Sequence, residues 1–227
     1  MEAITGAKGG SQKQHTPVEQ PDSAQSMARC RMLLALGEGE FAGGLDATSI
    51  FLDGTPLGNS DRTMNFENVS WEFRPGTQTQ TPIPGFPAVE NETTVGVSLT
   101  KATPWTRALS NTQIDAVLVR IGIPGLQQQE NDGDIVGTTV KYHIDLAVDG
   151  GAFSTVMTRT VTEKLSSLYE LTHRINLPKA STGWQIRVVR DTDDSTSQML
   201  QNKTQVQAIT EVIDARLRYP HTALLYV

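Results

Sequence analysis

Residues 140–157 read VKYHIDLAVDGGAFSTVM, and this stretch decides the fold class. Its apolar side chains recur at every second position from Val140 to Val148, while polar side chains occupy most of the positions between them. Successive side chains leave a β-strand on opposite faces, so this period predicts a half-buried strand. Asp149, Gly150 and Gly151 follow directly and are typical of a tight hairpin that turns into a second strand at residues 153–157. The stretch therefore predicts an antiparallel β-structure.

Working outward, the same period of two recurs from about residue 48 onward. Alternating or β-branched runs predict further strands, at residues 69–73, 95–99, 117–123, 169–177, 184–190 and 205–217. The last run is long enough for a helix, but its valines, isoleucines and threonines favour a strand. We expect the proline-rich residues 74–92 and the polar residues 191–204 to be surface loops. The fold class predicted is all-β, mainly antiparallel, with little helix and a β-sandwich between residues 66 and 204.

The bulk composition excludes several classes of function. The net charge is −6, from 19 basic and 25 acidic residues, and there is no basic run, so specific nucleic-acid binding is not expected. No apolar run is long enough to span a membrane, and the start lacks a secretion signal, which predicts folding in the cytoplasm of the producing cell. The single cysteine, Cys30, excludes an internal disulfide and a cysteine-based zinc site. We interpret Cys30 as a small buried apolar residue.

No catalytic, cofactor or metal site is predicted. We expect His143 on the solvent side of its strand beside Lys141 and Asp145, and His173 as a hydrogen-bonded core residue. Acidic turns at 130–134 and 191–194 suggest calcium ligands, but they lack the spacing of a calcium loop. Local backbone hydrogen bonding is the better explanation of such turns. The sequence predicts a protein that is not an enzyme, with binding residues unknown.

The tryptophans allow a second interpretation, because exposed aromatic rings stack on sugars. Trp71 and Trp184 alternate in register with apolar neighbours and are predicted to be core residues. Trp105 follows a proline and is the one candidate for an exposed ring. The alternative function is therefore a carbohydrate- or protein-binding β-sandwich of the adhesin kind, and it requires an exposed aromatic or apolar patch near Trp105 and residues 74–92.

Residues 1–27 hold almost no large apolar side chains and are rich in Gly, Ser, Gln and Pro. Burial cannot offset the entropy of ordering such a segment, which predicts a flexible N-terminal arm. A second possibility is an arm that orders only against a neighbouring subunit.

Several collinear stretches carry a resemblance to a known family. They are GEGEF at 37–41, SIFLDGTP at 49–56, FRPGTQTQ at 73–80, PGF at 84–86, TPWTR at 103–107, LQNKT at 200–204, TEVID at 210–214 and RYPHTAL at 218–224. In order and spacing they resemble the N-terminal region of the tip attachment protein J (host specificity protein) family of lambda-like phages and prophages. The resemblance extends from about residue 9 to residue 225.

The resemblance implies a structural virion protein at the phage tail tip, made in the host bacterial cytoplasm. It implies a baseplate hub that forms a homotrimer and contacts other tail-tip and tail-tube proteins, with the host receptor bound only by a C-terminal part absent from this chain. Residues 28–66 and 205–227 then correspond to strands of an incomplete hub barrel, with an unpaired edge. Residues 67–204 correspond to the inserted sandwich. The host, its receptor, the oligomeric state of this chain and the origin of its C-terminus stay open.

Overall fold

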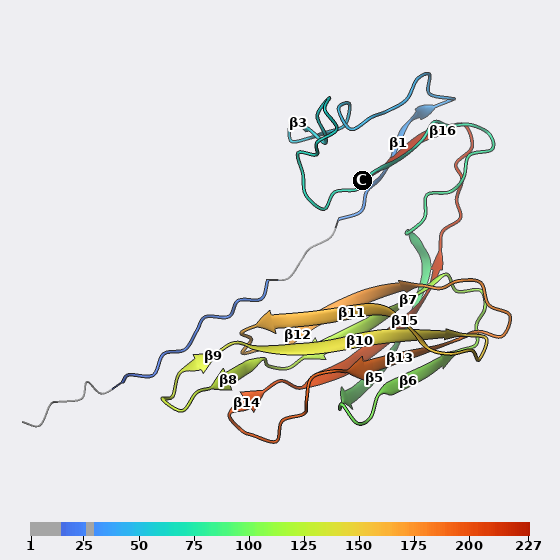
Figure 1. The fold of residues 1–227 in the computed structure, drawn as a ribbon. Helices are drawn as coiled ribbons and strands as arrows, with labels where there is room; N and C mark the ends of the chain where they lie inside the picture. The colour runs from blue at the N-terminus through green and yellow to red at the C-terminus, as the bar shows by residue number, and fades with distance from the viewer. Residues whose placement is uncertain (1–14, 26–29) are drawn as a thin grey trace, which may run out of the picture. The chain divides into compact units, whose positions relative to one another are not determined.

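The computed structural model describes residues 15–25 and 30–227, and within them the chain is built of β-strands and loops without a helix. The chain divides into two compact units (Figure 1). Among the described residues, the first comprises 15–25, 93–112 and 118–209, and the second comprises 30–92, 113–117 and 210–227. The all-β fold class is thereby confirmed.

The predicted hairpin is the centre of the first sheet of unit 1. The strand β10 (Thr138–Val148) pairs antiparallel with β11 (Ser154–Glu163) on one side and with β13 (Trp184–Arg190) on the other. The strand β6 (Trp105–Leu109) pairs with β13 and completes the order β11-β10-β13-β6. Asp149 and Gly150 both have positive φ, at 51° and 74°, which is the backbone that the predicted tight turn requires.

A second sheet has the order β12-β7-β15-β5. Its strands are β12 (Tyr169–Asn176), β7 (Ala116–Ile123), β15 (Thr204–Asp214) and β5 (Pro87–Leu99). The alternating apolar residues of β7, and those of β10 from Val140 to Leu146, are buried, as the period of two predicted, whereas Val148 at the end of β10 is partly exposed. A hydrogen bond of 2.7 Å between the Tyr142 hydroxyl of β10 and His173 Nε2 of β12 joins the two sheets, which form the sandwich. His173 is half-buried, so the prediction of a hydrogen-bonded core histidine is confirmed.

Smaller strands extend this unit. The strands β14 (Leu200–Gln201), β8 (Gln127–Gln129) and β9 (Ile135–Val136) form a three-stranded sheet. The acidic turn at residues 130–134 joins β8 to β9, where Gly133 has a φ of +95°.

Unit 2 contains an open sheet with the order β1-β16-β4. Its strands are β1 (Leu33–Glu38), β16 (Thr222–Tyr226) and β4 (Glu72–Arg74), and a short hairpin of β2 (Phe51–Leu52) and β3 (Thr55–Pro56) lies in the same unit. Ile50, Leu57 and Leu225 form its buried cluster, and Trp71 packs against it. Within the described residues the sheet is not closed into a barrel, and β1 and β4 are its edges. The unpaired edge expected for residues 28–66 is therefore present at β1, whereas the hub barrel itself stays a prediction.

Four local predictions are wrong. Residues 191–204 are not a loop throughout, because they contain β14 at Leu200–Gln201 and the first residue of β15, Thr204. Residues 74–92 are not a loop throughout, because β5 begins at Pro87, where the missing N–H of proline is tolerated at the first residue of an edge strand. Asp145 does not face solvent: it is only 2% exposed, because Arg187 and Thr155 on the neighbouring strands cover it. Cys30 is exposed and not buried, since it precedes the first paired residue of β1.

Candidate functional site

The residues considered as candidate sites in the sequence are engaged in local structure. His143 Nδ1 lies 2.9 Å from Asp191, and its Nε2 lies 3.6 Å from Asp145. Burial acts to raise the pKa of Asp145, but hydrogen bonds from Thr155 and Arg187 hold that pKa below its ordinary value. This group of charges covers the outer face of β10 and β13, and it offers no nucleophile beside a base.

The carboxylates of the two acidic turns likewise form ion pairs or hydrogen bonds with other residues of the chain. In the second turn, Asp193 pairs with Lys101 at 2.6 Å, and Asp194 pairs with the guanidinium of Arg190 at 3.1 Å. In the first turn, Asp132 and Asp134 lie beside His15, and these three are the described residues whose ligand atoms lie close enough together to hold a metal ion. A hydrogen bond of 2.7 Å from His15 to Asp134 accounts for their proximity.

The tryptophans do not form an exposed platform. Trp184 is 4% exposed and donates its indole N–H to the carbonyl of Pro178 at 2.9 Å. Trp71 packs partly buried on the core of unit 2, and Trp105 is partly buried opposite Val188 at the sheet edge. The core predictions for Trp71 and Trp184 agree with these positions.

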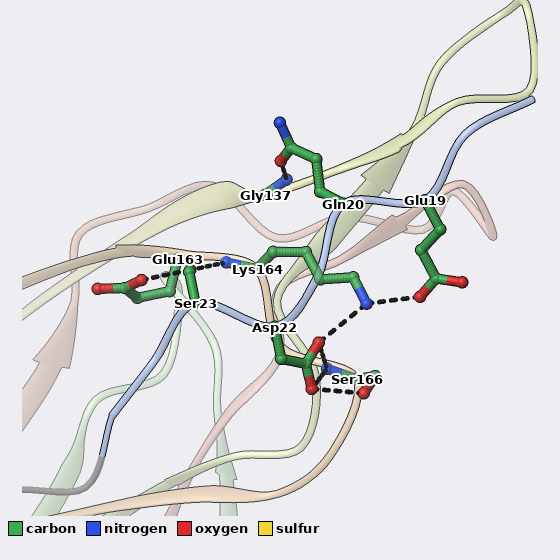
Figure 2. Close-up of polar contacts among 8 residues, drawn as sticks. All are labelled: Glu19, Gln20, Asp22, Ser23, Gly137, Glu163, Lys164 and Ser166. Atoms are coloured by element: carbon green, nitrogen blue, oxygen red, sulfur yellow. Dashed lines mark hydrogen bonds and ion pairs between the residues drawn. The ribbon is translucent and has the colours of Figure 1, made fainter.

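The most specific set of contacts is made by part of the N-terminal arm, whose composition predicted flexibility. Residues 15–25, named here the docked segment, run along the sandwich against residues 133–137 and 163–166, named here the docking surface (Figure 2). The N–H of Ile135 donates to the carbonyl of Val18 at 2.9 Å, and the N–H of Gln20 donates to the carbonyl of Ile135 at 2.9 Å. These bonds form a parallel bridge between Glu19 and Ile135. The docked segment therefore adds a short extended pairing to β9.

Lys164 is the centre of the contacts. Its side chain is 4% exposed, and its Nζ lies 2.6 Å from Glu19 Oε1 and 2.9 Å from Asp22 Oδ1. The hydrogen bonds that the Lys164 ammonium donates to Glu19, and then to Asp22, raise the pKa of Lys164. Asp22 also accepts hydrogen bonds from the N–H and the hydroxyl of Ser166. The Ser166 hydroxyl, followed by the Lys164 ammonium, lowers the pKa of Asp22 to about 2.

Two further groups fix the register of the docked segment. The N–H of Gly137 donates to Gln20 Oε1 at 3.0 Å, and the N–H of Lys164 donates to the Ser23 hydroxyl at 2.9 Å. The Ser23 hydroxyl in turn donates to Glu163, and the Ser23 N–H donates to the carbonyl of Lys164 (Figure 2). Separate groups of the docking surface thus form hydrogen bonds with positions 20, 22 and 23 of the docked segment.

At the other end, Asp134 holds the start of the docked segment. The N–H of Val18 donates to Asp134 Oδ1 at 2.7 Å, and this bond, followed by that from His15, lowers the pKa of Asp134. The same hydrogen bond with Asp134 raises the pKa of His15. Gly133 accommodates Pro17, since a Cβ at position 133 would lie 2.8 Å from Pro17 Cγ.

Apolar contact contributes little to this site. Val18 is 61% exposed, and Ala24 is the residue of the docked segment that packs against a buried cluster, the one around Leu126 and Leu165. Residues 1–14 and 26–27 of the predicted arm lie outside the described residues. In the single chain, the contacts of residues 15–25 are with residues of the same chain, and sequence reasoning missed them. The partner of Glu19 and Asp22 is more than 140 positions away, and no local pattern signals it.

The fold class is therefore an all-β protein that has a sandwich, an open three-stranded sheet and an extended segment docked by ion pairs. Residues 89–215 match the family model "Tip attachment protein J, FNIII-A domain". The chain is 53% identical over 229 residues to the tip attachment protein J of Escherichia phage SECphi4 and 40% identical over 224 residues to that of Escherichia phage SECphi27. Each alignment covers 99% of this chain. The chain therefore belongs to the tip attachment protein J family.

The comparisons also give the share of each relative's length that is covered and the similar solved structures. The chain spans about a fifth of the length of those relatives, 20% and 19%. Among solved structures it is similar to the C-terminal family 22 carbohydrate binding module of Clostridium thermocellum Xyn10B, with a TM-score of 0.31 and 15% identity over 63% of this chain and 85% of that chain. A CBM4 structure matches with a TM-score of 0.26 and 8% identity over 65% of this chain and 86% of that chain.

Proposed function

We propose that this chain is a structural, non-catalytic module of a phage or prophage tail tip that assembles with other tail-tip and tail-tube proteins. The observation that carries the proposal is the similarity to two tip attachment proteins along 99% of this chain. Host attachment would then be supported by the assembled full-length protein, with receptor binding outside this chain.

We further propose a hub role for unit 2, in which residues 28–66 and 205–227 contribute strands to a barrel completed by other segments, and residues 67–204 form the inserted sandwich. The open sheet supports this proposal at β1, which lies in residues 28–66 and presents an edge with unpaired backbone groups. The strand β4 at its other edge lies within residues 67–204, so the sheet also includes a strand from beyond the two barrel segments. Leu34 and Leu36 on β1 are 45% and 42% exposed, and apolar side chains at an open edge favour pairing with a further strand.

Two experiments test the proposal. Antibodies raised against this chain should label virions at the tail tip in electron micrographs, and labelling of the capsid or of no structure would contradict a tail-tip location. The mass of the chain in solution, alone and with downstream sequence, tests the hub role. We expect a monomer or weak association for the 227 residues and a trimer for the longer protein.

The adhesin-like alternative is tested separately with a glycan array. Within the described residues no tryptophan is among the exposed large apolar side chains, so there is no aromatic platform to favour it. Saturable sugar binding by the isolated chain, without assembly of the longer protein, would replace the hub proposal by this alternative.

A further inference from the structure

The docked segment contacts the sandwich as a separate peptide would. Residues 30–92 belong to unit 2, and 67 positions of sequence separate the end of the docked segment, Gln25, from the next residue of unit 1, Thr93. The segment is held to unit 1 by hydrogen bonds and ion pairs, and the chain that leaves it continues into the other unit. Its attachment to the docking surface is therefore a noncovalent binding event with an identifiable ligand.

The chemistry of the docking surface defines that ligand. With the segment docked, the Lys164 ammonium is almost fully buried and pairs with two carboxylates, those of Glu19 and Asp22, which lie three positions apart. The Ser166 N–H and hydroxyl require an acceptor at the second carboxylate, and the Gly137 N–H requires one at Gln20. An extended acidic peptide with this spacing satisfies every one of these groups, and residues 15–25 carry it.

We infer that the docking surface is a peptide-binding site whose occupant in the assembled protein is residues 15–25 of a second copy of this chain, exchanged between subunits. This inference rests on the proposed assembly of several copies at the tail tip. Three observations support exchange. The contacts are polar, so release exposes little apolar surface; the segment leads into unit 2, not into the unit that it binds; and every copy presents the same ligand and the same site. In a homo-oligomer, replacing an intrachain contact by the identical interchain contact costs little.

Peptide binding by the docking surface is tested on the 227-residue chain, with its own docked segment altered so that it no longer binds. In the variant Glu19→Lys/Asp22→Lys, two ammonium groups would face Lys164, so the segment leaves the site. A fluorescent peptide of residues 15–25, HTPVEQPDSAQ, should bind this variant saturably and with decreasing affinity as salt increases. The same peptide with lysine at positions 19 and 22 should bind at least about tenfold more weakly, because one side of a desolvated charge pair is reversed. Equal binding of the two peptides would overturn the assignment of the site.

Exchange is tested by charge reversal. Lys164→Glu makes a chain with a reversed site and a natural segment, while Glu19→Lys/Asp22→Lys makes a chain with a natural site and a reversed segment. Neither chain can dock its own segment, but in a 1:1 mixture each segment matches the site of the other chain. We expect each variant alone to be monomeric and the mixture to form a heterodimer, measured by native mass spectrometry.

The triple variant with all three substitutions is the matched control, because its segment and site are complementary again within one chain. It should be monomeric at the concentration at which the mixture dimerises, and its circular dichroism and melting temperature verify that the reversed charges are tolerated. Absence of a heterodimer in the mixture, with all variants folded, would overturn the exchange. The tail-tip proposal would fail separately, by absence of virion labelling.

Discussion

Gln80 connects Gly76 to residues 218–222, which lead into β16 of unit 2. Its replacement gives a sharp test of the structure. Its side chain is 5% exposed, and its Nε2 donates to the carbonyls of Arg218 at 2.7 Å, Tyr219 at 2.8 Å and Thr222 at 3.0 Å. Its Oε1 accepts the N–H of Gly76 at 2.8 Å. One amide thus fixes the loop that follows β4 to the residues that lead into β16.

The expected cost of Gln80→Ala follows from the groups that are left behind. The Tyr219 carbonyl keeps a second donor, the N–H of Thr222, but the Gly76 N–H and the carbonyls of Arg218 and Thr222 lose the hydrogen bond that Gln80 makes with them. A buried polar group without a partner costs about 1–3 kcal/mol, so we expect a loss of roughly 2–4 kcal/mol in the free energy of unfolding. At about 2–4 °C per kcal/mol for a chain of this size, the melting temperature should decrease by roughly 5–15 °C.

The fluorescence of Trp71 is the assay, because Trp71 packs on the core of unit 2 whereas Trp105 and Trp184 belong to unit 1. Gln78→Ala is the matched control: it changes the same residue type two positions away, where the side chain is exposed, and should alter stability by less than about 0.5 kcal/mol.

A third variant separates hydrogen bonding from packing. Gln80→Glu keeps the shape but replaces the donor by a carboxylate that faces three carbonyl oxygens, so at neutral pH it should destabilise more than alanine does. The folded state disfavours the charged glutamate and raises its pKa above the unfolded value of about 4.3. Its penalty should therefore be smallest in acid and grow as the pH rises above the unfolded value. If Gln80→Ala and Gln80→Glu both melt within the range of Gln78→Ala, the reasoning is refuted.

Three further predictions concern unit 1. Tyr142→Phe removes the hydrogen bond with His173 between the two sheets while keeping the ring, and should cost about 1 kcal/mol in chemical unfolding; no change would mean that water replaces the bond equally well. Because the docked carboxylate of Asp22 has its pKa lowered from 3.8 to about 2, the stability that it gives to docking is complete above the unfolded value and is lost as the pH falls toward about 2. NMR signals of the docked segment should report this loss of docking, and signals unchanged down to pH 2 would contradict it. Gly183→Ala places a Cβ 2.1 Å from the backbone oxygen of Leu109 at a φ of +122°, so we expect a loss of at least about 2 kcal/mol, measured by thermal unfolding, and a wild-type melting temperature would exclude the close approach.

Strand identity was predictable because it depends on local side-chain order. The alternation from Val140 to Val148 is a property of nine neighbouring residues, and the tight turn at Asp149 and Gly150 needs no information from elsewhere. The exposure of Asp145 was not predictable in the same way. Alternation indicates which face a residue is on, but not that Arg187 on the neighbouring strand will lie over that face and bury a carboxylate.

The candidate site was beyond sequence reasoning for a related reason. Composition correctly indicates that residues 15–25 cannot form a hydrophobic core, but docking here depends on ion pairs and hydrogen bonds whose partners are distant in sequence. Gln80 is a parallel case. The stretch FRPGTQTQ contributes to a family resemblance, yet which of its two glutamines is structural depends on where residues 218–222 return.

The polar character of the docked segment also bears on exchange between subunits. A segment held by apolar side chains would expose them whenever it left its site, and during assembly this exposed surface would bind indiscriminately. A segment held by Lys164 stays soluble when free, because Glu19 and Asp22 are well hydrated carboxylates, and it recovers its specificity only where an ammonium and the Ser166 donors are positioned together. The sandwich core is apolar, so its strands cannot separate without exposing apolar side chains, and we expect it to form within one chain. The division between an apolar core and a polar docked segment is therefore what a subunit needs if it folds alone and then joins identical neighbours.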